Sequence, residues 1–125
     1  MIGYVTLGSN DIPRGAAFYD ELLGLFGAKR FMEMDSYVAW GSDPAKPMLS
    51  IIKPHDGAEA TVGNGTMVAL LMDNTDLVDT AHAKVLALGG VDEGPVGPRG
   101  EGGFYAGYCR DLDGNKLCFY HVRQS

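Results

Sequence analysis

The sequence has little cysteine, no long apolar run and no recognisable signal peptide at its start. Its two cysteines, Cys109 and Cys118, both lie in strand-like segments. Two cysteines exclude a disulfide framework, so we expect buried free thiols. No apolar stretch approaches the roughly 18 residues of a membrane-spanning helix. The first residues lack the basic and apolar regions of a signal peptide, so we expect a cytoplasmic protein.

Basic residues are also scarce, with ten against sixteen acidic ones and a net charge of −6. Such a charge repels phosphate backbones and anionic lipid headgroups, so we expect neither nucleic acid nor membrane as a partner. The 125 residues, 46% of them hydrophobic, suffice for a single domain with its own core. The 18 glycines fall between apolar runs, which predicts many short strands.

In the first half, the apolar periodicity changes from strand to helix and back. Residues 2–8 alternate as a strand does, with Val5 and Leu7 on one face. A helix capped by Asn10 or Asp11 follows and ends near Gly27. The three remaining strands are predicted over residues 30–34, 37–41 and 48–53.

The second half restarts the same pattern after a segment poor in apolar residues. A strand over residues 66–72 precedes a helix that is capped by Asn74 or Thr75 and ends at Gly89. Residues 94–103 lack the Gly-Lys-Ser/Thr of a phosphate-binding loop and no helix follows them, so we expect a mobile loop. The last strands are predicted over residues 91–96, 105–110 and 116–122.

The two halves resemble each other at an offset of 63 residues. This offset places Val5 on Val68 and Gly27 on Gly90, whereas the closing strands align at an offset of 68. Two unrelated units are the alternative, but the coinciding glycines and helix ends favour a repeat. We therefore predict an α+β domain over residues 1–125, made of two tandem βαβββ modules, residues 1–54 and 66–125, with a linker over residues 55–65.

Several motifs carry a resemblance to a known superfamily. They are Phe18-Tyr19 before Leu23-Gly24, the aromatic run over residues 103–108, and the Asp-Leu-Asp-Gly-Asn hairpin over residues 111–115. With the repeat, they make the chain similar to the vicinal oxygen chelate superfamily, which includes glyoxalase I, bleomycin-resistance proteins and extradiol dioxygenases. The resemblance implies that the modules form an open cup of mixed β-sheet. It also implies a homodimer.

Enzymes of this superfamily bind a divalent metal in the cup through His, Gln or Glu side chains from four strands. The matching positions here are Tyr4, Ser50, Met67 and Cys118, and none is a usual ligand. Met67 with Cys118 would suit only a soft metal, and an apolar lining is the commoner use of such a pair. The three histidines, His55, His82 and His121, are expected at the surface or rim. We therefore expect no metal cofactor at the standard site.

The cup without a metal would be an apolar pocket with a few polar groups. Strand alternation directs Thr6 and Tyr120 to the same side of the sheets as the four positions above. The alternative for the aromatic residues is that they only fill the hydrophobic core. The candidate ligand-binding residues are Tyr4, Thr6, Trp40, Ser50, Met67, Tyr105, Tyr108, Cys118 and Tyr120.

We therefore expect a protein that binds a small, partly aromatic or apolar molecule. The alternative is a metal-dependent lyase or dioxygenase with a displaced or shared metal site, and a domain without any ligand is a third reading. Metal-free catalysis would need Cys118 or a tyrosine activated by Lys116. Arg99 and Arg110 would either attract an anionic group at the mouth of the cup or pair with Asp111 and Asp113.

Overall fold

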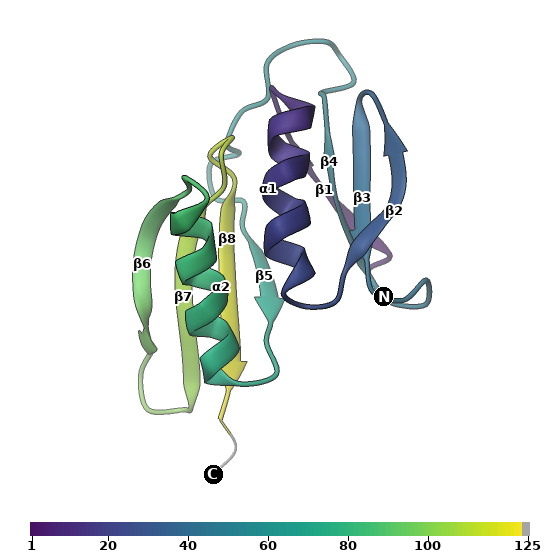
Figure 1. Ribbon diagram of the computed structural model, residues 1–125. Coiled ribbons are helices and arrows are strands. Elements are labelled where there is room, and N and C mark those ends of the chain that lie inside the picture. Colours follow the sequence, from purple (N-terminus) through teal and green to yellow (C-terminus); the bar gives the residue numbers. More distant parts are fainter. Residues whose placement is uncertain (124–125) are drawn as a thin grey trace. The chain divides into compact units, whose positions relative to one another are not determined.

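A computed structural model describes residues 1–123 of the chain. The chain divides into two compact units, Met1–Val62 and Gly63–Ser125, and each contains one helix and four strands. The order of elements is βαβββ in both units (Figure 1). The predicted tandem α+β fold is therefore confirmed. No helix within residues 1–123 is long and apolar enough to cross a membrane.

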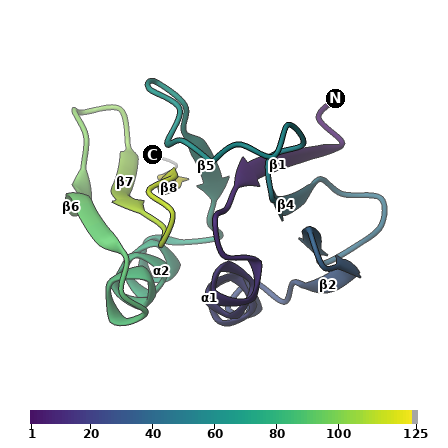
Figure 2. The ribbon, with the colours of Figure 1, turned by 90° about the horizontal axis from the view of Figure 1, so that it is seen from above.

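The first unit is a four-stranded sheet with one helix on one of its faces (Figure 2). The order of strands in the sheet is β1-β4-β3-β2, in which β1 is parallel to β4 and the other pairs are antiparallel. The elements are β1 (Tyr4–Gly8), α1 (Ile12–Gly24), β2 (Lys29–Met34), β3 (Tyr37–Gly41) and β4 (Met48–Ile52).

The second unit repeats this topology with the strand order β5-β8-β7-β6. Its first strand is again parallel to its last, and α2 covers one face of the sheet (Figure 2). The elements are β5 (Val68–Leu71), α2 (Thr75–Ala87), β6 (Val91–Pro98), β7 (Phe104–Arg110) and β8 (Lys116–Val122).

Both helices begin at the caps that the sequence predicts. Asp11 accepts a hydrogen bond from the backbone N–H of Arg14, and Pro13 lies in the first turn. Asn74 accepts one from the N–H of Leu77. Gly27, after α1, has a φ of +78°, a conformation that glycine adopts without strain. Local chemistry therefore fixes the ends of the elements that carry each core.

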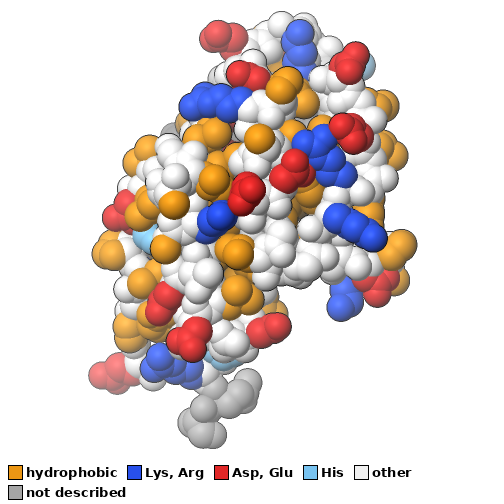
Figure 3. Space-filling model, viewed as in Figure 1, with side chains coloured by type: hydrophobic (Ala, Val, Ile, Leu, Met, Phe, Trp, Pro, Cys, Tyr) orange, Lys and Arg blue, Asp and Glu red, His pale blue; other side chains and the backbone are white. Residues whose placement is uncertain are grey.

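The core of each unit lies between its helix and its sheet. In the first unit Leu22 and Tyr19 of α1 are fully buried, as is Trp40 of β3. In the second unit Val78 and Val85 of α2 are buried with Phe119 of β8. On the face drawn in Figure 3, acidic and basic side chains are interspersed among apolar ones, so no extended patch of one charge sign is visible there.

Two expectations about the second unit are wrong. The predicted mobile loop over residues 94–103 is wrong in its first half, because β6 continues to Pro98 and pairs with β7 through Gly94 and Gly97. His82 is not at the surface but 6% exposed, and its Nε2 lies 3.0 Å from both Asp92 Oδ1 and the carbonyl oxygen of Tyr108. A carbonyl only accepts, so Nε2 carries the hydrogen.

Candidate functional site

Each sheet has a second face, opposite its helix, which we call the helix-free face. In the first unit it carries Tyr4, Thr6 and Ser50, because Leu7 and Leu49 point toward the core. Ser50 Oγ donates to the carbonyl oxygen of Val5 at 2.9 Å and accepts from the hydroxyl of Thr6 at 2.9 Å. Ser50 is fully buried and Tyr4 is 59% exposed. The structure thus brings three of the predicted residues together on β1 and β4.

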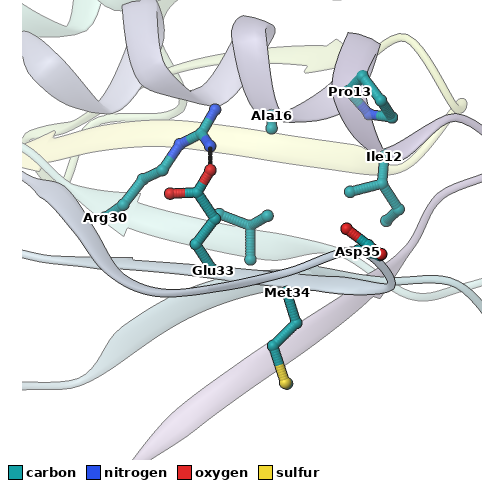
Figure 4. A pocket seen from close by; sticks show the side chains of 8 residues that line it. Ile12, Pro13, Ala16, Arg30, Glu33, Met34 and Asp35 are labelled. Carbon is teal, nitrogen blue, oxygen red and sulfur yellow. Dashed lines mark hydrogen bonds and ion pairs between the residues drawn. The ribbon is translucent and has the colours of Figure 1, made fainter.

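Two methionines on this face are absent from the sequence prediction. Met32 pairs with Ala39, which in turn pairs with Ser50, so Met32 lies on the helix-free face. Met34 points away from Ile12, Pro13 and Ala16, as Figure 4 shows. Both methionines are about half exposed. Strand alternation in β2 could have indicated this placement. However, the pairing register of β2 shifts between Arg30 and Met32, and this shift changes which residues share a face.

Trp40 lies on the other side of the sheet from the position expected of a ligand-binding residue. Its indole Nε1 donates to Asp20 Oδ1 of α1 at 2.8 Å, and its ring packs against Tyr19. Only 1% of Trp40 is exposed. Asp20 also accepts hydrogen bonds from Arg30, which hold the pKa of its carboxyl below the ordinary range. Trp40 therefore belongs to the core and to a polar network with α1.

In the second unit the helix-free face carries Tyr108, Cys118 and Tyr120. Tyr108 pairs with Cys118 across β7 and β8, and Tyr120 follows Cys118 by two residues. Phe104, which the sequence analysis did not select, lies on the same face, with its ring centre 5.4 Å from that of Tyr120. Phe104 and Tyr108 are four residues apart in one strand, and residues at even spacing share a face, so the sequence could have predicted this position.

Cys118 is enclosed beneath these aromatic side chains. Burial raises the pKa of its thiol, whereas Arg99, Tyr108 and Lys116 act to lower it. The thiol is 1% exposed and is therefore neutral and apolar at pH 7. Cys109, on the opposite face of the sheet, has a pKa raised to about 12 by burial. Both cysteines are free and buried, as predicted.

Other predicted residues of the second unit lie elsewhere. Tyr105 is on the helix-covered face, where its hydroxyl donates to Asp79 of α2 at 2.6 Å and this bond raises the tyrosine pKa. Met67 precedes β5 and is 42% exposed. Arg110 pairs with Glu93 rather than with Asp111 or Asp113.

A cavity lies at the surface of each unit. In the first unit, a cavity of about 330 Å³ lies between the start of α1 and the β2–β3 hairpin, beside the ion pair of Arg30 and Glu33 (Figure 4). In the second unit, a cavity of about 460 Å³ lies at the ends of β5 and β8, and Leu71 and Tyr120 line it. Of these two cavities, the second is lined by a candidate ligand-binding residue, Tyr120, and the first by none.

The residues at the metal-ligand positions do not fit the divalent metal of the superfamily. The hydroxyl hydrogen of Ser50 is committed to Val5, and the Cys118 thiol is held protonated by burial. Hard divalent metals prefer carboxylate ligands, and borderline ones also bind imidazole. Within residues 1–123, no three His, Cys, Asp or Glu side chains are grouped as a metal site.

Comparisons with known proteins agree on one family. The sequence profile of the Glyoxalase/Bleomycin resistance protein/Dioxygenase superfamily matches residues 1–119. A glyoxalase/bleomycin resistance protein from Albidiferax ferrireducens T118 is 35% identical, with a TM-score of 0.87 over 98% of this chain and 99% of that one. No curated protein matches.

More distant solved structures share the fold. Lactoylglutathione lyase from Agrobacterium tumefaciens is 21% identical, with a TM-score of 0.71 over 97% of this chain and 92% of that one. A glyoxalase/bleomycin resistance protein/dioxygenase family enzyme from Burkholderia phytofirmans PsJN is 16% identical, with a TM-score of 0.76 over 97% and 98% of the two chains. From the profile match and the 35% identity, the chain belongs to the glyoxalase/bleomycin resistance protein/dioxygenase superfamily.

Proposed function

We propose that this protein binds a small, partly aromatic or apolar molecule on the helix-free face of the sheet in its second unit, without the metal of its enzymatic relatives. The observation that carries the proposal is the surface around Tyr120. Its ring lies beside that of Phe104, and Tyr120 itself lines the cavity together with Leu71. Leu71 is 66% exposed. Exposed apolar and aromatic surface next to a cavity is typical of a ligand site.

A polar group on the same face would orient the ligand. The Tyr108 side chain lies on the face of Cys118, and its hydroxyl can donate or accept a hydrogen bond. The donor set described above favours this binding role over metal-dependent lyase or dioxygenase chemistry. Trp40 and Tyr105 are left out of the proposed site because they contact α1 and α2.

Binding is tested with N-phenyl-1-naphthylamine, a neutral aromatic probe whose fluorescence rises in an apolar environment. We expect saturable binding that Tyr120→Ala weakens about 3- to 10-fold, because an aromatic contact contributes about 0.5–1.5 kcal/mol. Tyr105→Ala is the matched control, since Tyr105 lies in β7 on the opposite face from Phe104 and Tyr108. Equal weakening by both variants, or no binding by the native protein, would contradict the proposal.

A further inference from the structure

Two cations converge on one tyrosine ring of the second unit. The guanidinium carbon of Arg99 is 5.4 Å from the centre of the Tyr108 ring, and the ammonium nitrogen of Lys116 is 5.5 Å from it. Tyr108 lies on the helix-free face with Cys118. The side chains of Arg99, Tyr108 and Lys116 are partly exposed. This places two positive charges at one end of the proposed ligand site.

Neither cation is paired with a carboxylate within residues 1–123. Two other arginines do have carboxylate partners: Arg30 contacts Asp20 and Glu33, and Arg110 contacts Glu93. Sixteen acidic residues are available for ten basic ones. Arg99 and Lys116 share the Tyr108 ring instead, and an oxyanion bound beside that ring would be attracted by both charges. Two cations on one partly exposed tyrosine ring, next to an apolar face, therefore point to a ligand with an anionic group.

Arg99 is held in place before any ligand arrives. Its Nη1 donates to the carbonyl oxygen of Gly97 at 3.0 Å, and its Nη2 donates to that of Pro95. These bonds fix the side chain, so little further side-chain entropy is lost when an anion binds. A guanidinium has five N–H groups, and its Nε–H has no acceptor within residues 1–123. The arginine thus combines a fixed position with donors that are still available.

The apolar part of the face begins next to this pair. From Lys116 to Tyr120, β8 extends about 13 Å, at about 3.3 Å per residue. Cys118 lies between them with a protonated thiol, and Tyr120, Phe104 and Leu71 form the far end. A molecule of about this length would place an anionic group near Arg99 and Lys116 and an apolar body against Tyr120.

We propose that the ligand is a small organic oxyanion with an aromatic or apolar body, whose charged group is recognised by Arg99 and Lys116 beside Tyr108. This inference rests on the proposed function, since it concerns the same face. It adds the chemical class of the ligand and the two residues that select it. An aromatic carboxylate or sulfonate fits this description, whereas a neutral aromatic molecule leaves both cations unpaired.

The test compares two probes that differ by one charged group. 8-Anilinonaphthalene-1-sulfonate and N-phenyl-1-naphthylamine share their rings, and only the first carries a sulfonate. We expect the sulfonate to bind at least 10-fold more tightly to the native protein. Lys116→Gln should weaken the sulfonate about 3- to 10-fold and leave the neutral probe unchanged. Lys116→Arg should restore the preference, because it restores the charge.

Lys46→Gln is the matched control, since it removes the same charge from an exposed loop of the first unit. 1-Naphthoate should displace the sulfonate probe at concentrations at which inorganic phosphate does not. Displacement by phosphate alone would instead identify a plain anion site and overturn the inference about the apolar body. Equal affinity for the two probes, unchanged by Lys116→Gln, would overturn the anion preference while the proposed function stands. Absence of binding by either probe would overturn both.

Discussion

At the scale of single residues, strand alternation was a good guide to polar positions and a poor one to large aromatic residues. Thr6 and Ser50 meet as their spacing predicts. Trp40 and Tyr105 turn toward the helices, because each finds a carboxylate there, Asp20 on α1 and Asp79 on α2. A buried indole needs an acceptor, and the acceptor lies on a distant element that periodicity does not locate.

The Trp40–Asp20 hydrogen bond gives a prediction about stability. Asp20→Ala should lower the free energy of unfolding by about 1–3 kcal/mol, since it leaves the buried indole N–H without an acceptor. Asp20→Asn keeps an oxygen in place and should cost less. Denaturation in urea measures both variants. The same loss in Ala and Asn variants would mean that the charge, rather than the acceptor, stabilises the fold.

Asp20 also makes stability depend on pH. Arg30 holds the pKa of Asp20 in the folded state below its ordinary value of 3.8. A lowered pKa stabilises the folded state above pH 3.8, and this contribution disappears as the pH falls through the lowered value. In urea denaturation at a series of acidic pH values, Asp20→Asn should therefore lose less stability than the native protein. Parallel curves for the two proteins would contradict this assignment.

At the scale of elements, both helices and all eight strands follow from the sequence, with errors at the ends. The carboxyl-terminal end of β6 was predicted as part of a loop, because residues 94–98 contain glycine and proline. The segment forms a strand nonetheless, since Gly94 and Gly97 pair with Tyr108 and Ala106 and the register shifts between them. Shifts of this kind depend on the partner strand and cannot be seen in one segment alone.

A glycine in β7 shows how closely α2 packs on its sheet. A Cβ at Gly107 would lie 2.7 Å from Val96 Cγ1 and 3.0 Å from His82 Cδ2. Gly107→Ala should therefore destabilise the protein by about 1–3 kcal/mol. Gly97→Ala in β6 is the control, because its nearest contact would be an ordinary 3.5 Å. Thermal unfolding compares the two, and equal shifts in Tm would contradict this account.

At the scale of the whole molecule, the family was recognisable from the sequence because two halves repeat one pattern. The ligand was not, since it depends on which side chains share a face and on which charges lack partners. Arg99 and Lys116 are 17 residues apart in the sequence, yet both lie beside Tyr108. The homodimer and the cytoplasmic location stay predictions, and light scattering of the purified protein tests the first.

Metal content is the whole-molecule measurement that separates binding from metal-dependent catalysis. The untagged protein would be incubated with nickel, zinc, manganese and iron(II), desalted, and measured by mass spectrometry. We expect far less than one metal per chain, because Ser50 offers only a neutral hydroxyl, the Cys118 thiol is buried and protonated, and no three His, Cys, Asp or Glu side chains within residues 1–123 are grouped as a metal site. Retention of one metal per chain would favour the lyase or dioxygenase alternative, and substitution of His55, His82 and His121 would then seek its ligands.

The parallel pairing of first and last strands has a consequence for synthesis on the ribosome. Within residues 1–123, β5 pairs in its sheet with β8 alone, which is the last strand that the structure describes. Until residues 116–122 have been translated, β5 exposes an unpaired edge, whereas the first unit already has its closing strand, β4. A chain that stops before β8 therefore holds one complete sheet and one strand without a partner. Such a product would be prone to aggregation, so synthesis of β8 is the step that removes the exposed edge of β5.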